Sequence, residues 1–247
     1  MPNRITHWGG LQTQVLEPSH AGDILGNVVL CHGYGASGTD LVPLTPAFLQ
    51  CAPSLQNRVR FIYPAAPLDL EDQGIPGGRA WWNIDLMRLQ QTIAAGRGRE
   101  LLDQSPSTLP DVREQFFRFL HECASETGIP LSRTLIGGFS QGSMLTTDAA
   151  LHLPAPPAGL IVLSGMLMNQ AVWQNQSQQR SGLSVFQSHG RYDPLLPYEF
   201  ALSLRDLLQA AGNSVEFHEF PGAHEIPYEI VEAAASFVER RLAAAVP

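Results

Sequence analysis

The sequence contains few cysteines and no long hydrophobic run. Only three cysteines, Cys31, Cys51 and Cys123, occur in 247 residues, and their wide spacing argues against a disulfide framework. We therefore expect free thiols and a reducing compartment, which predicts a cytoplasmic protein. The first residues lack the apolar segment of a secretory signal, and no stretch approaches the length of a membrane span. Stable insertion into a membrane is not expected.

Basic residues are also scarce. Fifteen Lys and Arg stand against 23 Asp and Glu, which gives a formal net charge of −8, and no basic cluster is visible. Nucleic acids and anionic membrane surfaces are bound through basic patches, so the composition argues against a nucleic-acid partner. The length suits a single α/β domain with a well-filled core. We expect one domain over residues 1–247, without repeats or dividing linkers.

Short apolar runs alternate with helix-like segments along most of the chain. Runs of this kind are typical of strands buried on both faces of a sheet, and they occur at 28–31, 59–63, 134–139, 160–163 and 183–186. Helices are expected at 41–49, 85–102, 110–128, 198–211 and the C-terminal end, a hairpin at 5–17, a long loop at 64–79 and an exposed strand at 215–220. This alternation predicts an α/β fold with a mostly parallel central sheet and helices on both faces.

The most informative motif is G-x-S-x-G, at residues 138–142. In this pattern a serine occupies a sharp turn between a strand and a helix, and the flanking glycines allow the two elements to approach closely. The turn projects the Ser140 hydroxyl out of the sheet. It also leaves the Gln141 N–H at a helix N-terminus, where an oxyanion would form. Ser140 is therefore a candidate nucleophile.

A serine nucleophile needs a base and a carboxylate that orients the base. Asp193 follows the strand at 183–186, and His224 follows the strand at 215–220. Alone, Asp193 before Pro194 suits a turn, and His224 suits an ordinary loop histidine. Together with Ser140 they stand in the chain order Ser, Asp, His and at the carboxyl ends of strands, which favours a catalytic triad. His32 and His189 are expected to fill space or to form local hydrogen bonds.

The loop after the strand at 28–31 offers a second oxyanion donor, the Tyr34 N–H, between Gly33 and Gly35. Residues 33–38 also match G-x-G-x-x-G, which is typical of dinucleotide binding. That interpretation requires an acidic residue at the end of the next strand, where the sequence has Pro64 and Ala65 instead. Metal binding is not favoured either, because Pro221 and Gly222 prevent a helix that would align His218 with His224.

These motifs resemble the phospholipase/carboxylesterase family of α/β-hydrolases, which includes the acyl-protein thioesterases. The resemblance rests on residues 32–35, 80–84, 128–130, 137–142, 189–197 and 222–226. It implies an α/β-hydrolase fold, Ser140 as nucleophile, His224 as general base, Asp193 as its orienting carboxylate, and an oxyanion hole from the Tyr34 and Gln141 N–H groups. It also implies hydrolysis of carboxylic esters, sometimes thioesters, without a metal or an organic cofactor.

The chain departs from the family pattern at several places. Tyr34 stands where leucine is common, and Ser143 stands where a second glycine is usual. The loop around 64–84 and the stretch 85–110 do not follow the family pattern, and we expect them to shape substrate choice. Apolar residues that follow strands or lie in the long loop are candidate pocket walls: Trp81, Trp82, Met166, Met168, Leu195, Leu196 and Ile226.

The sequence thus predicts a serine hydrolase that cleaves a small-molecule carboxylic ester with a short to medium acyl chain through an acyl-enzyme. A histidine base acts only when neutral, so activity is expected to rise with pH between about 6 and 7. The alternatives are an acyl-protein thioesterase or a lysophospholipase. A serine peptidase and a non-catalytic hydrolase-fold binding protein are less favoured. The sequence leaves open whether the chain forms a homodimer.

Overall fold

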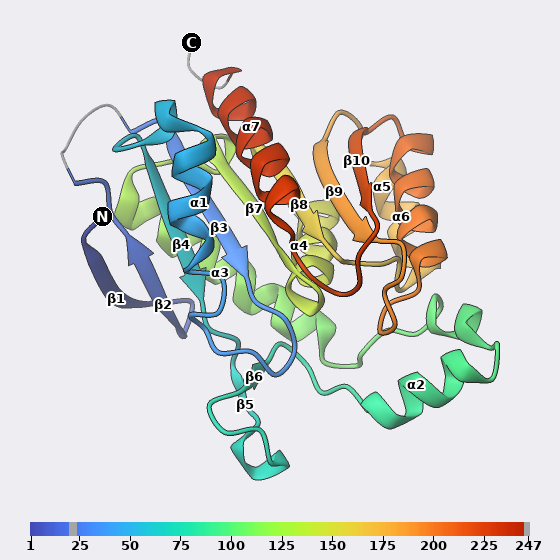
Figure 1. Ribbon diagram of the computed structural model, residues 1–247. Coiled ribbons are helices and arrows are strands. Elements are labelled where there is room, and N and C mark those ends of the chain that lie inside the picture. The colour runs from blue at the N-terminus through green and yellow to red at the C-terminus, as the bar shows by residue number, and fades with distance from the viewer. Residues whose placement is uncertain (20–23, 245–247) are drawn as a thin grey trace.

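A computed structural model describes residues 1–19 and 24–244. Its main sheet has eight strands in the order β1-β2-β4-β3-β7-β8-β9-β10. β2 is antiparallel to both of its neighbours, and the remaining pairs are parallel (Figure 1). The strands are β1 (Asn3–Trp8), β2 (Leu11–Leu16), β3 (Gly26–Cys31), β4 (Val59–Pro64), β7 (Thr134–Phe139), β8 (Gly159–Leu163), β9 (Ser184–Gly190) and β10 (Ser214–Phe220).

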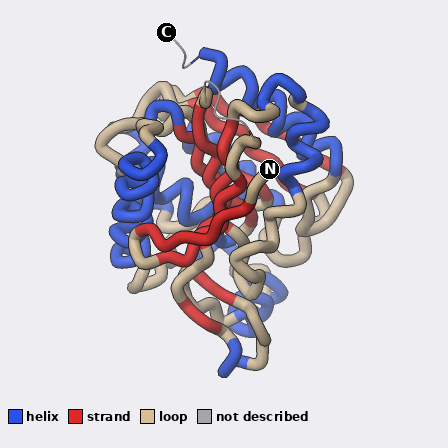
Figure 2. The backbone as a smooth tube through the Cα atoms, turned by 90° about the vertical axis from the view of Figure 1, so that its left-hand side faces the viewer, coloured by secondary structure: helices blue, strands red, loops and turns tan. Residues whose placement is uncertain are grey.

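Helices cover both faces of this sheet, as Figure 2 shows. They are α1 (Leu44–Cys51), α2 (Leu86–Ala94), α3 (Leu109–Thr127), α4 (Gln141–His152), α5 (Gln170–Gln178), α6 (Tyr198–Ala210) and α7 (Tyr228–Ala244). Apolar residues of α1 and α7 pack into the core on one face, and those of α3, α4, α5 and α6 pack into the core on the other. No helix in the described part of the chain combines the length and apolarity that crossing a bilayer requires. The predicted mostly parallel α/β fold is confirmed.

β7 lies in the interior of the sheet. β7 pairs with β3 on one side and with β8 on the other, and all residues of β3 and β8 are buried. Gly137 in β7 permits close packing, because a Cβ there would lie 2.4 Å from the Ile161 carbonyl oxygen. The strand that carries the G-x-S-x-G motif therefore lies between two fully buried strands in the interior of the sheet.

The segment between β4 and α3 lies beyond the carboxyl ends of the parallel strands (Figure 1). The predicted loop at 64–79 contains a short antiparallel hairpin of β5 (Leu68–Asp69) and β6 (Arg79–Ala80). The helix predicted at 85–102 is shorter, because α2 ends at Ala94 and Gly96 takes a positive φ of 70°. A 3-10 turn, Gly98–Leu101, follows. Helix α5 was not predicted from the sequence.

Candidate active site

Ser140 occupies the sharp turn between β7 and α4. Its φ of 52° and ψ of −121° form a combination that residues with a side chain rarely adopt, at a cost of about 1–3 kcal/mol. Two contacts hold the turn in place. The Ser140 N–H donates to the Leu163 carbonyl of β8 at 2.9 Å, and the Ser143 hydroxyl donates to the Ser140 carbonyl at 2.6 Å. The serine at position 140 thus lies at the tip of a sterically enforced elbow.

The motif glycines are required by close backbone contacts with the end of β3. A Cβ on Gly138 would lie 2.4 Å from the Cys31 carbonyl oxygen, and a Cβ on Gly142 would lie 2.1 Å from the same atom. These distances are far shorter than van der Waals contact, and the opposing atoms are backbone atoms that cannot rotate away. The sequence pattern therefore has a direct steric cause in the packing of α4 against β3.

We expect Gly142→Ala to destabilise the protein by about 3 kcal/mol or more, because the methyl group would force β3 and α4 apart. Gly182→Ala is the control. A Cβ at Gly182 would meet nothing within 4 Å, so its φ of 79° alone should cost about 1–2 kcal/mol. Urea unfolding followed by circular dichroism gives both values. Equal losses would mean that the close approach at Gly142 is not what the fold requires.

Asp193 and His224 form a short hydrogen bond at the carboxyl ends of β9 and β10. The distance from His224 Nδ1 to Asp193 Oδ2 is 2.6 Å. Asp193 Oδ1 accepts the backbone N–H groups of Leu195 and Leu196, both at 2.9 Å. The two loops pack tightly, because a Cβ on Gly190 would lie 2.1 Å from the Ala223 carbonyl oxygen. The carboxylate is therefore fixed on both oxygens and orients the imidazole.

The Asp193 side chain is fully buried. Burial alone would raise the pKa of Asp193, but the hydrogen bonds from His224, Leu196 and Leu195 outweigh it and hold the pKa below its usual value. The carboxylate is thus ionised at neutral pH and complements a positive charge on the imidazole. A second buried histidine, His189, lies 3.3 Å from Asp193 Oδ2 and 2.8 Å from the Leu196 carbonyl oxygen through its Nε2. The sequence suggested only local bonding for this residue.

The loops after β3, β7 and β10 converge around Ser140. The imidazole of His224 lies against the ring of Phe139, with 4.7 Å between ring centroids. The Ser164 hydroxyl, after β8, donates to the Glu225 carbonyl at 3.3 Å. On the other side, a Cβ on Gly33 would lie 3.3 Å from the Ser140 Cβ. Chain segments more than 80 residues apart therefore meet at the elbow.

The hydrogen bonds found among residues 1–19 and 24–244 do not include one between Ser140 and His224. Catalytic hydrogen bonds are often long in unliganded enzymes and shorten when substrate binds. The same described residues provide no acceptor for the Tyr34 N–H or the Gln141 N–H. Because Gln141 is completely buried, its unpaired donor would be costly without a partner. An oxyanion is one such partner.

A cavity of about 270 Å³ lies next to the elbow, between α2, α4 and the loops after β8 and β9. Four of the predicted pocket residues line it, namely Trp82, Met166, Met168 and Leu196. The Leu196 N–H donates to the Asp193 carboxylate, and the Trp82 carbonyl accepts a hydrogen bond from Gln141 Nε2. The remaining wall includes Leu89 and Arg88 on α2 and Gln104 and Ser105 after it, all within the stretch 85–110 that the sequence predicts to shape substrate choice. It also includes Met144 on α4, which the sequence did not indicate.

The other three predicted pocket residues lie elsewhere. Trp81 is fully buried, and its indole N–H donates to the His32 carbonyl at 2.9 Å. Leu195 is 38% exposed. Ile226 packs against the core on the α1 and α7 face of the sheet. None of the three lines the 270 Å³ cavity.

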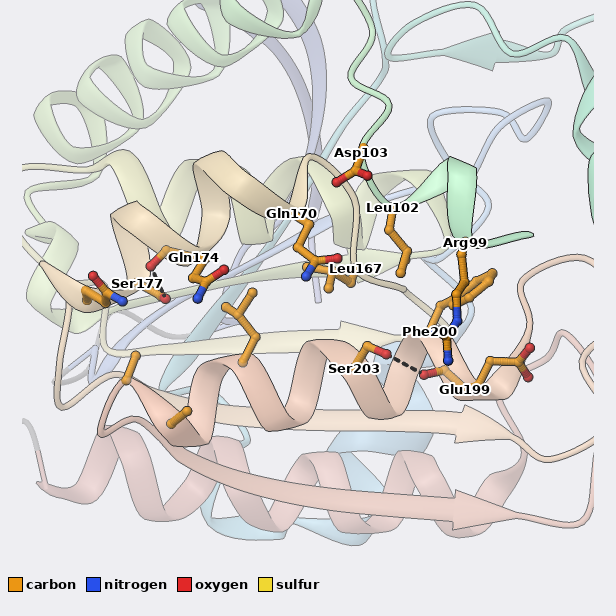
Figure 3. Close-up of a pocket in the computed structure, with 14 residues that line it drawn as sticks. Arg99, Leu102, Asp103, Leu167, Gln170, Gln174, Ser177, Glu199, Phe200 and Ser203 are labelled. Carbon is orange, nitrogen blue, oxygen red and sulfur yellow. Dashed lines mark hydrogen bonds between the residues drawn. The ribbon is translucent and has the colours of Figure 1, made fainter. Parts of the chain in front are cut away.

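A second cavity of about 600 Å³ lies between α5 and α6 (Figure 3). Its lining does not include Ser140, Asp193 or His224. Glutamine side chains of α5 and the Glu199, Phe200 and Ser203 side chains of α6 line it, and the Ser203 hydroxyl is satisfied by the Glu199 carbonyl at 2.8 Å. Its serines, Ser177 and Ser203, donate their hydroxyls to backbone carbonyls of α5 and α6 rather than to a side-chain base. Within the described residues, no group of three or more His, Cys, Asp or Glu is arranged to hold a metal ion.

The strand order and the nucleophile elbow define an α/β-hydrolase fold. The sequence matches the phospholipase/carboxylesterase family over residues 19–242, and the chain belongs to this family of serine hydrolases. It is 27% identical over 220 residues to acyl-protein thioesterase 1 of Neurospora crassa, covering 87% of this chain and 86% of the relative. It is also 27% identical to lysophospholipase-like protein 1 of Mus musculus, covering 87% of each chain.

Solved structures show the same architecture. The crystal structure of esterase PE8 superimposes with a TM-score of 0.77 at 25% identity, covering 93% of this chain and 98% of that one. A carboxylesterase from Mesorhizobium loti superimposes with a TM-score of 0.73 at 17% identity, covering 97% and 99%. At such low identity, the second likeness supports the fold alone.

Proposed function

We propose that this hydrolase cleaves carboxylic esters with short to medium acyl chains through an acyl-enzyme on Ser140. His224 takes the proton of the Ser140 hydroxyl as its oxygen bonds to the substrate carbonyl carbon. The same histidine returns the proton to the leaving alcohol, and the ester C–O bond breaks. Water, activated by His224, then releases the acid and frees the serine. Asp193 keeps the imidazole in the tautomer and orientation that this proton transfer needs.

The observation that carries the proposal is the 2.6 Å hydrogen bond between Asp193 and His224. The imidazole in this pair packs against Phe139, the residue that precedes Ser140. A buried, ionised carboxylate that fixes Nδ1–H leaves Nε2 free to accept a proton. The Tyr34 and Gln141 N–H groups are the proposed oxyanion donors, and each such donor is typically worth a factor of about 100–1,000 in turnover.

The 270 Å³ cavity is the proposed acyl site. Its inner wall of methionine, leucine and tryptophan side chains suits a hydrocarbon chain, and its volume is near the lower end of small-ligand pockets, at about 300–1,000 Å³. We infer that residues 82–84 and the stretch 85–106, which supply much of the wall, determine chain length within a single domain. The substrate in this proposal is a small-molecule ester, and the three free cysteines favour a cytoplasmic location.

Met168→Trp should discriminate against longer acyl chains, because the larger side chain would fill the cavity beside the elbow. Each buried methylene contributes about 0.8 kcal/mol, so kcat/KM for p-nitrophenyl octanoate should fall more than about tenfold while that for the acetate stays within about threefold. Met87→Trp is the matched control, since Met87 is 72% exposed and does not line the cavity. If both esters lose activity equally in Met168→Trp, the acyl chain binds elsewhere.

The thioesterase alternative is supported by the names of the relatives, which include acyl-protein thioesterases and a lysophospholipase-like protein. Thioesters pass through the same acyl-enzyme, so the catalytic groups do not separate the two reactions. A panel of oxygen esters and thioesters of matched acyl length, with lysophospholipid included, measures the preference directly. An amide substrate in the same panel tests the peptidase alternative.

A further inference from the structure

His32 follows β3 directly and is almost completely buried, at 2% exposure. Its Nδ1 lies 2.8 Å from the Gly33 carbonyl oxygen. Its Nε2 lies 3.0 Å from the backbone nitrogen of Ala66, in the loop after β4. Both ring nitrogens are thus engaged, one by the loop that carries Tyr34 and the other by the loop after β4.

These partners determine the tautomer of His32. The Ala66 backbone nitrogen can only donate, so Nε2 must be the acceptor and carry no proton. Nδ1 then carries the proton and donates it to the Gly33 carbonyl. Burial lowers the pKa of His32, in agreement with a neutral ring. The bond between Nδ1–H and Gly33 O is therefore a fixed feature of the site.

The Gly33 carbonyl belongs to the same planar peptide unit as the Tyr34 N–H. A donor that holds this carbonyl also sets the direction in which the opposite N–H points. Resonance in the peptide further polarises an N–H whose carbonyl accepts a hydrogen bond. We propose that His32 is a positioning residue for the oxyanion hole, which aims the Tyr34 N–H at the reacting carbonyl through the Gly33 peptide. This inference rests on the proposed function of Ser140.

Other hydrogen bonds limit the loop to the same arrangement. The Trp81 indole N–H donates to the His32 carbonyl at 2.9 Å, and the Trp81 backbone N–H donates to Gln141 Oε1 at 2.9 Å. The Gly35 N–H donates to the Arg79 carbonyl at 2.9 Å. A longer bond of 3.4 Å from the Ala36 N–H also reaches Gly33 O. Among these bonds, the one from His32 is the short hydrogen bond to the Gly33 carbonyl, whose peptide unit carries the Tyr34 N–H.

Two substitutions separate positioning from simple packing. The amide nitrogen of asparagine lies near the place of Nδ1 and can donate to Gly33 O. The amide oxygen of glutamine lies near the place of Nε2 and can accept from Ala66, but offers no donor to Gly33. We expect His32→Gln to lower kcat for p-nitrophenyl acetate about 10–100-fold with KM within about threefold. His32→Asn should retain kcat within about fivefold.

A trifluoromethyl ketone, whose adduct with serine carries an oxyanion, should lose affinity in proportion to kcat across the two variants. If His32→Gln keeps kcat and His32→Asn loses it, the ring acts through Ala66 as structural support and the inference is overturned. Equal losses in both variants also overturn it. Retained turnover in Ser140→Ala would instead refute the proposed function, so the two failures are distinguishable.

A measurement on the unmodified protein covers the case in which a variant does not fold. Nitrogen-15 NMR of the histidine side chains distinguishes the two neutral tautomers. A protonated Nδ1 and an unprotonated Nε2 for His32 are expected between pH 6 and 8. A proton on Nε2 would remove the donor to Gly33 and overturn the inference.

Discussion

Ser140→Ala is expected to reduce kcat for a p-nitrophenyl ester by about 10⁴-fold or more, because the acyl-enzyme cannot form without the hydroxyl. The fold should be retained. Alanine keeps the Cβ that the elbow already accommodates at φ 52°, and the backbone bond from residue 140 to the Leu163 carbonyl does not involve the hydroxyl. Stopped-flow or steady-state kinetics with the ester measure kcat, and thermal unfolding measures whether the fold is retained.

Ser132→Ala is a suitable control, since Ser132 is exposed on a surface turn before β7. It should leave both kcat and the unfolding midpoint unchanged. A fluorophosphonate probe adds an independent readout, because it should label the unmodified protein and the control but not Ser140→Ala. Substantial esterase activity in a correctly folded Ser140→Ala protein would contradict the proposed mechanism.

Asp193→Asn should lower kcat by about 10⁴-fold through the tautomer of His224. Asp193 Oδ1 accepts two backbone N–H groups, from Leu195 and Leu196, so the asparagine oxygen is required at that position. The amide nitrogen must then face His224 Nδ1 and donate to it. The imidazole proton moves to Nε2, which can no longer accept the proton of Ser140. Ester kinetics at pH 7 measure the loss.

Asp206→Asn, at an exposed residue of α6, provides the matched control and should have no effect on kcat. The difference in unfolding free energy between the unmodified protein and Asp193→Asn should also depend on pH. The folded-state pKa of Asp193 lies below its unfolded value of about 3.9, so the carboxylate stabilises the fold above pH ~4 and this contribution is lost as pH falls through the folded pKa. The stability difference between the unmodified protein and Asp193→Asn should therefore shrink below pH ~4. A constant difference would show that the bond to His224 is not maintained.

The parts of the fold that sequence reasoning predicts well are those with a strong local cause. The motif glycines at 138 and 142 are required because the Cys31 carbonyl oxygen at the end of β3 leaves no room for a Cβ at either position. The five-residue motif therefore suffices to predict the elbow. Buried strands such as β3 and β8 appear as continuous apolar runs because both of their faces are covered. Family membership, predicted from such motifs, is confirmed by the match over residues 19–242. The roles of Ser140, Asp193 and His224 stay predictions.

Other features depend on tertiary contacts that the sequence does not display. Helix α5 carries mostly polar residues, and Trp173, its largest buried side chain, packs into the core and donates to Asp148 through its indole N–H. Asp148 is fully buried and paired with Arg113 at 3.0 Å, although its position on α4 gave no sign of burial. The neighbouring residues Trp81 and Trp82 have different environments, because only Trp82 lines the 270 Å³ cavity.

The placement of the proposed base has a consequence for how activity would fail under mild stress. β7, which ends directly before Ser140, has strands on both sides, whereas β10 is an edge strand and most of its side chains are partly exposed. An edge strand can separate locally while the rest of a sheet stays folded. Separation of β10 from β9 would move the His224 imidazole away from Ser140 while the rest of the molecule stays native. The catalytically competent population would then be smaller than the folded population, and it would recover as soon as the strand re-pairs.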